Sequence, residues 1–473
     1  MNKESRIQNI ERSCNEKDNL IGEIEIPWKD GLESMKVYKI PLEYLVYNKY
    51  NGRILSRTKS LESQHQMIDV ETDYGRDLIA KLLWDSKVDR NKKTLETINA
   101  PGGGQQKPGI ITRDGIIIDG NRRAMLLRKS GKYSYFKAVV LPVTLDENPL
   151  EIEKLETSFQ MGEDEKLGYN PIEKYLKAKS LYKKLSGENY LSKNADLKSI
   201  QKIADWMGED SPTVKEYLEV MCTMDDYLDY LEYNGIYTQL DGREDQFIQL
   251  TRWLNNFYGS ESAKAFDGYR DDDVDDLKTI AYDYIRIKYE GKQFRHLAYG
   301  LRENHFFGDK EIWTSFRDYH FEKKQKITED SIDLNSQNLE RHLNDRDNKF
   351  YEKSKLGNVE SFLKENDDTH YTWLRNKQSA GQPEKLVRNA IRSLESINQR
   401  NKNFKSPEVS RELEILNNSA SQLLANSSIE KLFSHIITLL QKIDITKSTE
   451  DKESIIKKAK TIQQIVYKMT KEI

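Results

Sequence analysis

Residues 109–123 of the chain read GIITRDGIIIDGNRR. Two short β-branched runs flank an Arg-Asp-Gly turn, which predicts a pair of short strands. A glycine at position 120 then separates the second strand from residues 121–130, which have helical character. Alternating apolar and charged residues predict further strands at 21–28, 34–40 and 137–143. Strands that pass through a tight glycine into a helix are typical of a compact α+β unit.

The passage from strand to helix at 119–123 has the composition of an anion site. Gly120 lets backbone amides approach an anion closely, and the start of the helix adds a partial positive charge. Arg122 and Arg123 can supply forked donors to phosphate oxygens. On spacing alone, two solvated arginines in the first turn of a helix explain the pattern equally well.

Two segments carry a resemblance to a known family. The stretch 119–123 resembles the second box of ParB-type proteins, in which a Gly-x-Arg-Arg turn grips the triphosphate of a nucleotide. Residues 40–53, IPLEYLVYNKYNGR, resemble the first box. The resemblance spans about residues 21–227 and implies a ParB/sulfiredoxin-like domain that binds CTP or ATP, with or without Mg²⁺. The residues implied in phosphate binding are Arg53, Asp119, Gly120, Asn121, Arg122 and Arg123.

A third segment, 155–173, resembles the part of the family that joins the nucleotide domain to the helices. It keeps Gln160 and the run Asn-Pro-Ile-Glu at 170–173, but Thr157 and Ser158 stand where the family has a Glu-Asn pair. That pair helps to hold nucleotide and magnesium, and a hydroxyl is a poorer magnesium ligand than a carboxylate. The resemblance therefore implies nucleotide contacts from Ser158 and Gln160. The resemblance does not assign the metal ligands, and the acidic residues 163–165 are the candidates to replace the missing Glu-Asn pair.

Glu43 is the candidate catalytic residue. Some relatives that phosphorylate small molecules use a glutamate of the first box as a base, and Glu43 stands in that box. The competing interpretation is a carboxylate that faces solvent from the end of a strand, which is the common habit of this residue type.

From residue 150 onward helical periodicity replaces the strand pattern. We expect a nucleotide domain at 1–150, a helical domain at 151–321 and a C-terminal helical bundle at 322–473, sparsely packed at its start. Within the second, 199–221 predict a helix-turn-helix that resembles the DNA-reading module of ParB. Its DNA contacts would be Lys202, Ser211, Thr213 and Lys215. Because the same face carries Glu209, Asp210, Glu216 and Glu219, a protein-docking role is the alternative.

Composition limits the function classes. The 473 residues carry a net charge of −3, so no overall basic field draws the chain to nucleic acid, and any DNA contact must be local. Two cysteines allow neither a disulfide framework nor a cysteine zinc site. We find no apolar run for a bilayer and no signal peptide, and expect a protein of the bacterial cytoplasm or nucleoid.

The leading hypothesis is a ParB-like, nucleotide-dependent DNA-binding switch from plasmid or mobile-element maintenance, phage defence or a DNA-modification system. The alternative is an enzyme of the same fold: an NTP hydrolase, a phosphotransferase or a nuclease. In a third interpretation the pocket is vestigial and the terminal helices recruit a partner protein. Those helices could also join two copies of the chain as a homodimer.

Overall fold

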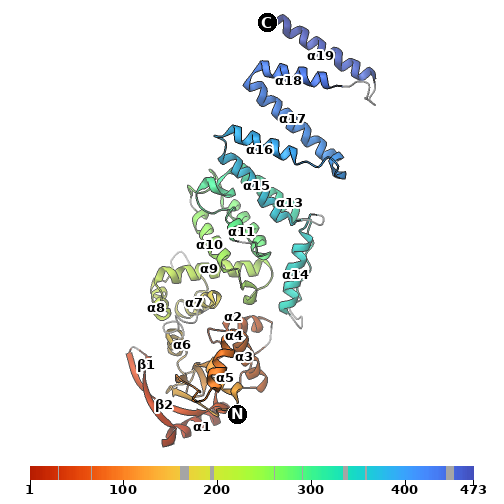
Figure 1. The fold of residues 1–473 in the computed structure, drawn as a ribbon. Coiled ribbons are helices and arrows are strands. Elements are labelled where there is room, and N and C mark those ends of the chain that lie inside the picture. The colour runs from red at the N-terminus through yellow and green to blue at the C-terminus, as the bar shows by residue number, and fades with distance from the viewer. Residues whose placement is uncertain are drawn as a thin grey trace. The chain divides into compact units, whose positions relative to one another are not determined.

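The computed structural model of the chain describes residues 1–29, 31–64, 67–159, 170–191, 196–259, 261–289, 291–333, 339–356, 360–443 and 452–472. By its internal contacts the chain divides into two units, Met1–Ala380 and Gly381–Ile473. The first begins with a six-stranded mixed sheet and continues as helices, whereas the second is helical (Figure 1). The predicted α+β class is therefore confirmed.

The sheet has the strand order β1-β2-β6-β4-β5-β3. Its strands are β1 Leu20–Trp28, β2 Gly31–Pro41, β3 Val46–Tyr47, β4 Gly109–Ile111, β5 Ile116–Asp119 and β6 Tyr135–Val140. The pairs β3–β5 and β4–β6 are parallel, and the other three are antiparallel. The strands predicted at 21–28, 34–40 and around 109–119 are confirmed, and the last strand begins two residues and ends three residues earlier than predicted.

Both faces of the sheet are covered, because neighbouring residues of a strand point to opposite sides. Ile117 belongs to an apolar cluster with Leu83 and Leu127, whereas Ile118 packs with Trp28 and Leu155. The helices of this part are α1 Lys3–Asn15, α2 Leu55–Ser63, α3 Asp73–Asp85, α4 Val88–Asn99, α5 Asn121–Ser130 and α6 Pro149–Thr157.

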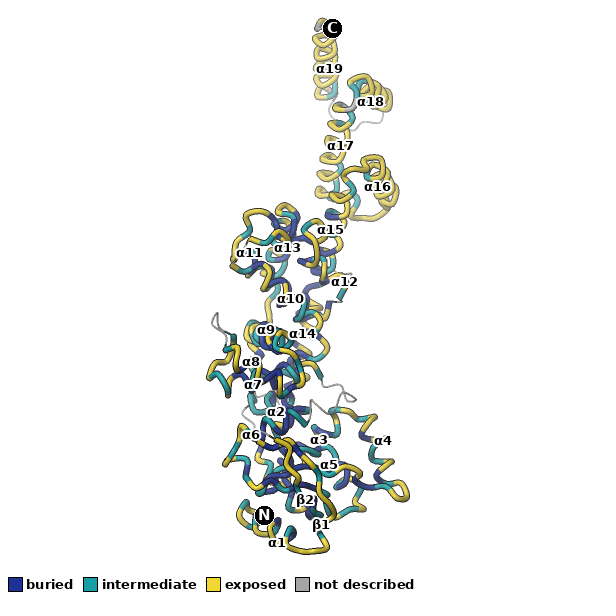
Figure 2. The backbone as a smooth tube through the Cα atoms, turned by 90° about the vertical axis from the view of Figure 1, so that its left-hand side faces the viewer, coloured by how far each residue is buried: buried dark blue, intermediate teal, exposed yellow. Residues whose placement is uncertain are grey.

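The rest of the first unit is a stack of helices around an aromatic-rich core (Figure 2). The helices are α7 Pro171–Ser186, α8 Leu197–Met207, α9 Ser211–Tyr230, α10 Glu244–Phe257, α11 Asp271–Arg286, α12 Gly291–Phe294, α13 Lys310–Lys324, α14 Leu339–Lys353 and α15 Phe362–Gln378. Phe350 and Leu374 belong to the same buried cluster as Phe247. The expectation of sparse packing after 322 is therefore wrong for α14 and α15.

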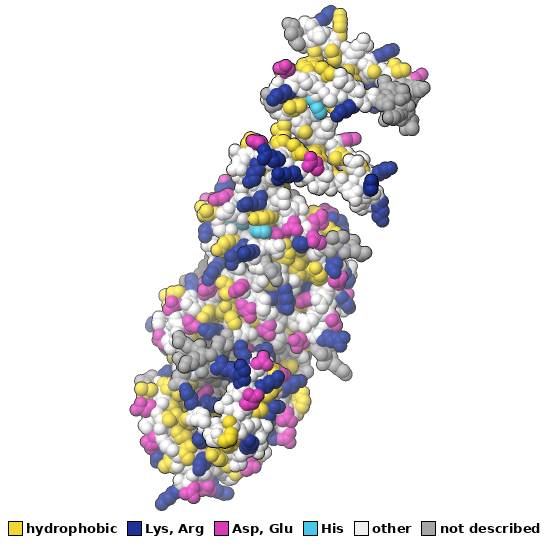
Figure 3. Space-filling model, in the orientation of Figure 1, with side chains coloured by type: hydrophobic (Ala, Val, Ile, Leu, Met, Phe, Trp, Pro, Cys, Tyr) yellow, Lys and Arg dark blue, Asp and Glu magenta, His cyan; other side chains and the backbone are white. Residues whose placement is uncertain are grey.

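The second unit contains α16 Pro383–Glu395, α17 Pro407–Ser427, α18 Ile429–Lys442 and α19 Lys452–Glu472. Its predicted helical character is confirmed. None of its described residues is buried, and apolar side chains lie open along its helices (Figures 2 and 3). Ile391, Leu423, Ile437 and Ile465 are each about half exposed or more. These helices carry amphipathic patterns with no cover for their apolar faces.

Candidate functional site

The turn between β5 and α5 depends on Gly120. This residue caps the helix in the left-handed conformation, with φ at 99°, and no side chain caps the first turn. A Cβ atom built at this position would lie 2.7 Å from Cζ of Phe136, so only glycine fits both the dihedral angle and the space. The start of α5 is therefore left open toward an anion, as predicted.

Arg123 is held in place by three groups of its own domain. Its Nη1 donates to the carbonyl oxygens of Lys107 at 2.6 Å and Pro108 at 2.9 Å, and its Nη2 pairs with the Asp119 carboxylate. These contacts tie the helix start to the loop that precedes β4. Because a fixed guanidinium loses little freedom when it binds phosphate, this arrangement favours a phosphate contact from its remaining donor positions.

Arg122 reaches the neighbouring helix α4. Its Nε donates to Oδ1 of Asn91, a fully buried amide whose Nδ2 donates to the carbonyls of Leu83 at 3.1 Å and Trp84 at 2.7 Å. The guanidinium is thereby aligned along the wall made by α4 and α5.

A cavity of about 360 Å³ opens in front of this turn. Among the described residues that line it, five are cationic, namely Arg53, Arg90, Lys107, Arg122 and Arg123. The one acidic side chain of that lining is Asp119, which Arg123 already neutralises. Ile98, Leu126 and Leu127 add an apolar floor. The structure thus brings Arg53 and residues 119–123, predicted from two separate segments, to one cavity.

Arg90 and Lys107 belong to this cavity but were missed by the sequence interpretation. Arg90 lies on α4, and Lys107 follows the glycines at 102–104. A basic residue in each segment is a weak signal, because tertiary contacts bring them to the cavity: α4 packs on α5, and the Lys107 carbonyl accepts from Arg123.

Asn121 joins the two boxes. Its Oδ1 accepts from the backbone N–H of Asn48 at 2.9 Å, and its Nδ2 donates to the carbonyl of Ile117 at 2.8 Å. Only 2% of Asn121 is exposed. Both polar atoms of the Asn121 side chain are used in this link. The role of this side chain is therefore to hold the cavity wall in place and not to contact a ligand.

Glu156 supports the turn of the first box from inside. Its Oε1 accepts from the side-chain amides of Asn48 at 3.4 Å and Asn51 at 3.5 Å, and Asn51 itself lines the cavity. From the sequence, Thr157 and Ser158, the next two residues along the chain, stand where the resembled family has its Glu-Asn pair. The acid that the structure brings to this turn is Glu156.

Lys177 of α7 completes a buried charge cluster with this acid. Its Nζ lies 3.3 Å from Oε2 of Glu156 and 3.3 Å from Oε1 of Glu153, and Glu153 also pairs with Lys184. Burial disfavours the ammonium, but the carboxylates of Glu156 and Glu153 more than offset this, so the pKa of Lys177 stays above its ordinary value. The cluster connects the cavity turn, α6 and α7.

Glu173 makes a second link between the sheet domain and the helices. From the first turn of α7 its carboxylate accepts from the backbone N–H of Ser56 at 2.9 Å and from the Ser56 hydroxyl at 2.6 Å. It therefore caps the start of α2. Burial raises the pKa of Glu173 to about 7, although the hydrogen bonds from Ser56 and the Arg57 guanidinium 3.9 Å away oppose the shift.

This raised pKa predicts a pH-dependent stability. The folded state holds the Glu173 proton more tightly than the unfolded chain does, so the stabilisation is complete below about pH 4.5 and is lost as pH rises to about 7. Each unit by which the pKa in the folded state exceeds that in the unfolded chain corresponds to about 1.4 kcal/mol, so the stability lost is a few kcal/mol. In Glu173→Gln the amide oxygen can still accept from the Ser56 N–H and the amide nitrogen can donate to the Ser56 hydroxyl, without a charge. The melting temperature of this variant should rise increasingly above that of the wild type between pH 5 and 8.

Thermal melts at matched pH and ionic strength would measure this difference. Glu25→Gln, at an exposed carboxylate of β1, serves as the control and should leave the pH profile unchanged. Parallel profiles for wild type and Glu173→Gln would contradict the assignment.

Glu43 does not join the cavity. It is exposed on the short 3₁₀ turn Leu42–Tyr44 and lines two other cavities together with Arg128. Arg128 lies six residues after Arg122, about 9 Å further along the helix axis. The structure therefore separates this candidate base from the turn at 119–123.

Of the two implied linker contacts, Ser158 follows α6 and is not among the residues that line the cavity. Gln160 and residues 163–165 lie outside the described residues. Among those that are described, no group of three or more His, Cys, Asp or Glu side chains could hold a metal ion. A Mg²⁺ ion at the cavity would find one protein carboxylate there, Asp119, and would otherwise depend on phosphate oxygens and water.

The helix-turn-helix is present as α8 and α9, joined at Gly208. The apolar spacing of this segment predicts a core of seven residues. Six of them, Ile200, Ile203, Ala204, Met207, Val214 and Leu218, are buried in one cluster, whereas Val220 is buried in the aromatic-rich cluster. Lys202 and Lys215 are exposed, the latter 3.6 Å from Glu219, whereas the Ser211 hydroxyl donates to Gln201 at 2.7 Å and Thr213 is half-buried in the first turn of α9. The four candidate DNA contacts thus lie on two neighbouring helices.

No family model matches the chain, and no curated protein matches it either. In the part of the chain that the structure describes, every helix is too short or too polar to span a bilayer.

Proposed function

We propose that the chain is a ParB-like, nucleotide-dependent DNA-binding switch, with CTP or ATP as the nucleotide. The observation that carries this proposal is the cavity at the start of α5. An uncapped, glycine-led helix start and five cationic side chains surround it, against a single acid that is already paired. A polyphosphate is the ligand class that satisfies this excess of positive charge.

The contacts behind the cavity support a switch. Asn51 forms part of the cavity wall, its amide donates to Glu156, and Glu156 pairs with Lys177 of α7. A nucleotide whose phosphates attract residues 40–53 would displace Asn51, and the hydrogen bond from Asn51 to Glu156 would transmit this movement to the buried charge cluster. Because α7 packs directly against α8 and α9, the same movement would reach the helix-turn-helix.

Contacts within the helical region also support DNA binding. Glu216 of α9 pairs with Arg252 at 2.7 Å, and Glu219 accepts from Asn255 at 2.8 Å, both on α10. Two of the four acids on the predicted DNA-facing surface therefore already contact residues of α10. Lys202, Ser211, Thr213 and Lys215 remain the proposed contacts to duplex DNA.

The proposed setting is plasmid or mobile-element maintenance, phage defence or a DNA-modification system in the bacterial cytoplasm or nucleoid. The uncovered apolar faces of α16 to α19 fit a homodimer or a partner-protein surface. Helices of this length gain most of their stability from buried apolar faces, so these helices need such cover.

The test is nucleotide binding by the purified chain, measured by calorimetry with CTP and ATP, with and without duplex DNA. A switch is expected to bind one of them with an affinity that duplex DNA changes, because coupling between two sites is reciprocal. Phosphate release or strand cleavage at a sustained rate would instead favour the enzyme alternative. No binding of either nucleotide would leave the partner-recruiting interpretation and reject the proposal.

A further inference from the structure

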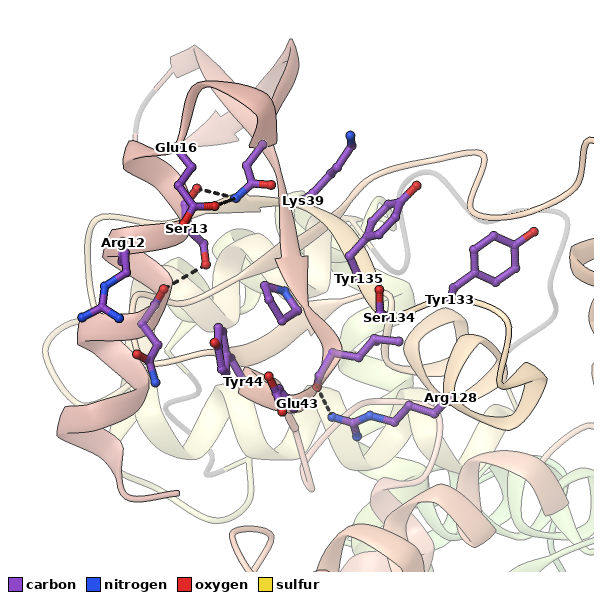
Figure 4. A pocket seen from close by; sticks show the side chains of 14 residues that line it. Arg12, Ser13, Glu16, Lys39, Glu43, Tyr44, Arg128, Tyr133, Ser134 and Tyr135 are labelled. Carbon is purple, nitrogen blue, oxygen red and sulfur yellow. Dashed lines mark hydrogen bonds between the residues drawn. The ribbon is translucent and has the colours of Figure 1, made fainter.

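A second set of cavities lies on the sheet domain, away from the phosphate-binding turn. One, of about 820 Å³, is bounded by α1, the end of β2 and the turn between α5 and β6 (Figure 4). Another, of about 630 Å³, lies between α3 and α5. Both are lined by Glu43 and Arg128, so they meet at these two side chains. The two neighbouring cavities are here called, together, the tyrosine groove.

The charged lining of the tyrosine groove is mainly positive. Its cations are Arg12, Lys39, Arg76, Lys81, Arg128 and Lys129, and its acids are Glu16, Glu43 and Asp77. Arg128 is occupied by the carbonyls of Leu42 and Leu45, but Arg12, Lys39 and Lys81 have no hydrogen bond or ion pair to any described residue. Unpaired cations distributed along a groove can contact successive negative charges of a polyanion.

Aromatic rings lie between these cations. Tyr44, Tyr133 and Tyr135 line the first cavity and are each partly exposed, and Trp84 lines the second. Figure 4 shows Tyr133 and Tyr135 side by side with Lys39, opposite Arg12 of α1. The ammonium of Lys39 lies 5.7 Å from the Tyr135 ring centroid. Rings and cations that alternate along a groove match the alternating bases and phosphates of a nucleic-acid strand.

We propose that the tyrosine groove binds single-stranded nucleic acid. Phosphates would contact Arg12, Lys39 and Lys81, and unstacked bases would lie on the tyrosine rings. A duplex offers no free base faces to these rings, and an acidic peptide would use the cations but not the aromatic surface. This inference is independent of the nucleotide cavity and of the helix-turn-helix, because it uses neither set of residues.

In the proposed complex, Glu43 would select among the bases of the bound strand. Its exposed carboxylate stands where the two cavities meet and can only accept hydrogen bonds when ionised. In an unpaired strand guanine presents two adjacent donors, N1–H and its exocyclic amino group, whereas thymine presents one, N3–H. The strand bound here is therefore expected to favour guanine over thymine next to Glu43, and Glu43→Gln should reduce that preference.

The experiment measures binding of fluorescent DNA and RNA oligonucleotides of about 12 nucleotides, within the usual site size, by anisotropy at several salt concentrations. Wild type should bind single strands of DNA, RNA or both, and a chain that lacks the proposed duplex contacts Lys202 and Lys215 should bind them more tightly than the matching duplex. Arg12→Ala with Lys39→Ala should reduce the slope of log affinity against log salt by about 1.4, since each phosphate contact to a single strand contributes about 0.7. Tyr135→Ala should weaken binding about tenfold, and Tyr135→Phe should keep it.

Three controls separate this site from others. Lys36→Ala removes an exposed cation from the same strand as Lys39 but from the opposite face, and should change nothing. Loss of single-strand affinity in Lys202→Ala with Lys215→Ala would place the strand at the helix-turn-helix and contradict the proposal, and far-ultraviolet circular dichroism would verify the fold of each variant. The proposal is overturned if wild type binds no single strand at low salt. It is also overturned if Tyr135→Ala binds as tightly as wild type, or if polyglutamate competes as well as an unlabelled oligonucleotide.

Discussion

Replacement of both Arg122 and Arg123 by alanine is expected to weaken nucleoside triphosphate binding at least a hundredfold. A charge-assisted hydrogen bond to phosphate contributes roughly 1.5–3 kcal/mol, and two guanidinium groups are lost. The Arg123 change has a further effect, because it leaves the Asp119 carboxylate uncompensated at the edge of the cavity. Calorimetric titration with CTP and with ATP, whichever the wild type binds, gives the affinity ratio directly.

The matched control for this pair is Arg113→Ala. Arg113 belongs to the same domain, is part-exposed and pairs with Glu147 at 2.8 Å, but it does not line the cavity. It should bind nucleotide as the wild type does. An affinity that stays unchanged in the double variant would show that the phosphates lie elsewhere, and the proposed site would be wrong.

Lys177→Met is expected to destabilise the first unit by about 3–5 kcal/mol. The change keeps the volume of the side chain but leaves the carboxylates of Glu153 and Glu156 without their buried partner. Only 4% of the Lys177 side chain and 6% of the Glu156 side chain are exposed, so water cannot replace the lost ion pair. Urea unfolding followed by tryptophan fluorescence measures the loss.

Lys184→Met provides the comparison within the same cluster. Its ammonium also pairs with Glu153, but half of its side chain is exposed, so the expected loss is at most about 1 kcal/mol. Adding Glu156→Gln to Lys177→Met should recover part of the stability, because one of the two stranded charges is then removed. Equal losses for Lys177→Met and Lys184→Met would contradict the buried-cluster assignment.

Local sequence patterns predicted the elements that bear the site. The β-branched runs at 109–118 gave the strands, and Gly120 followed by Asn121 gave the start of α5. The contacts between these elements could not be predicted in the same way. That Asn121 bonds to Asn48, or that Glu156 rather than its neighbours meets Asn51, depends on tertiary packing across more than seventy residues.

Buried polar side chains explain why the helices after 322 were misjudged. Arg346, Asp347, Asn366 and Asp367 are all at most 9% exposed, yet in sequence they resemble a solvated face. Asp347 accepts from Arg286 at 2.7 Å and from Tyr233 at 2.9 Å, partners that lie 61 and 114 residues away. Hydropathy alone assigns such residues to water, because it cannot include a partner that only the fold supplies.

The lack of buried residues in Gly381–Ile473 bears on how the whole chain unfolds. Cooperative melting requires elements that share a desolvated interior, and the described helices of this unit have none of their own. A calorimetric scan of the isolated chain would then contain a broad, low-enthalpy component from these helices beneath the sharp transition of the sheet and aromatic core. A single melting temperature would describe only Met1–Ala380.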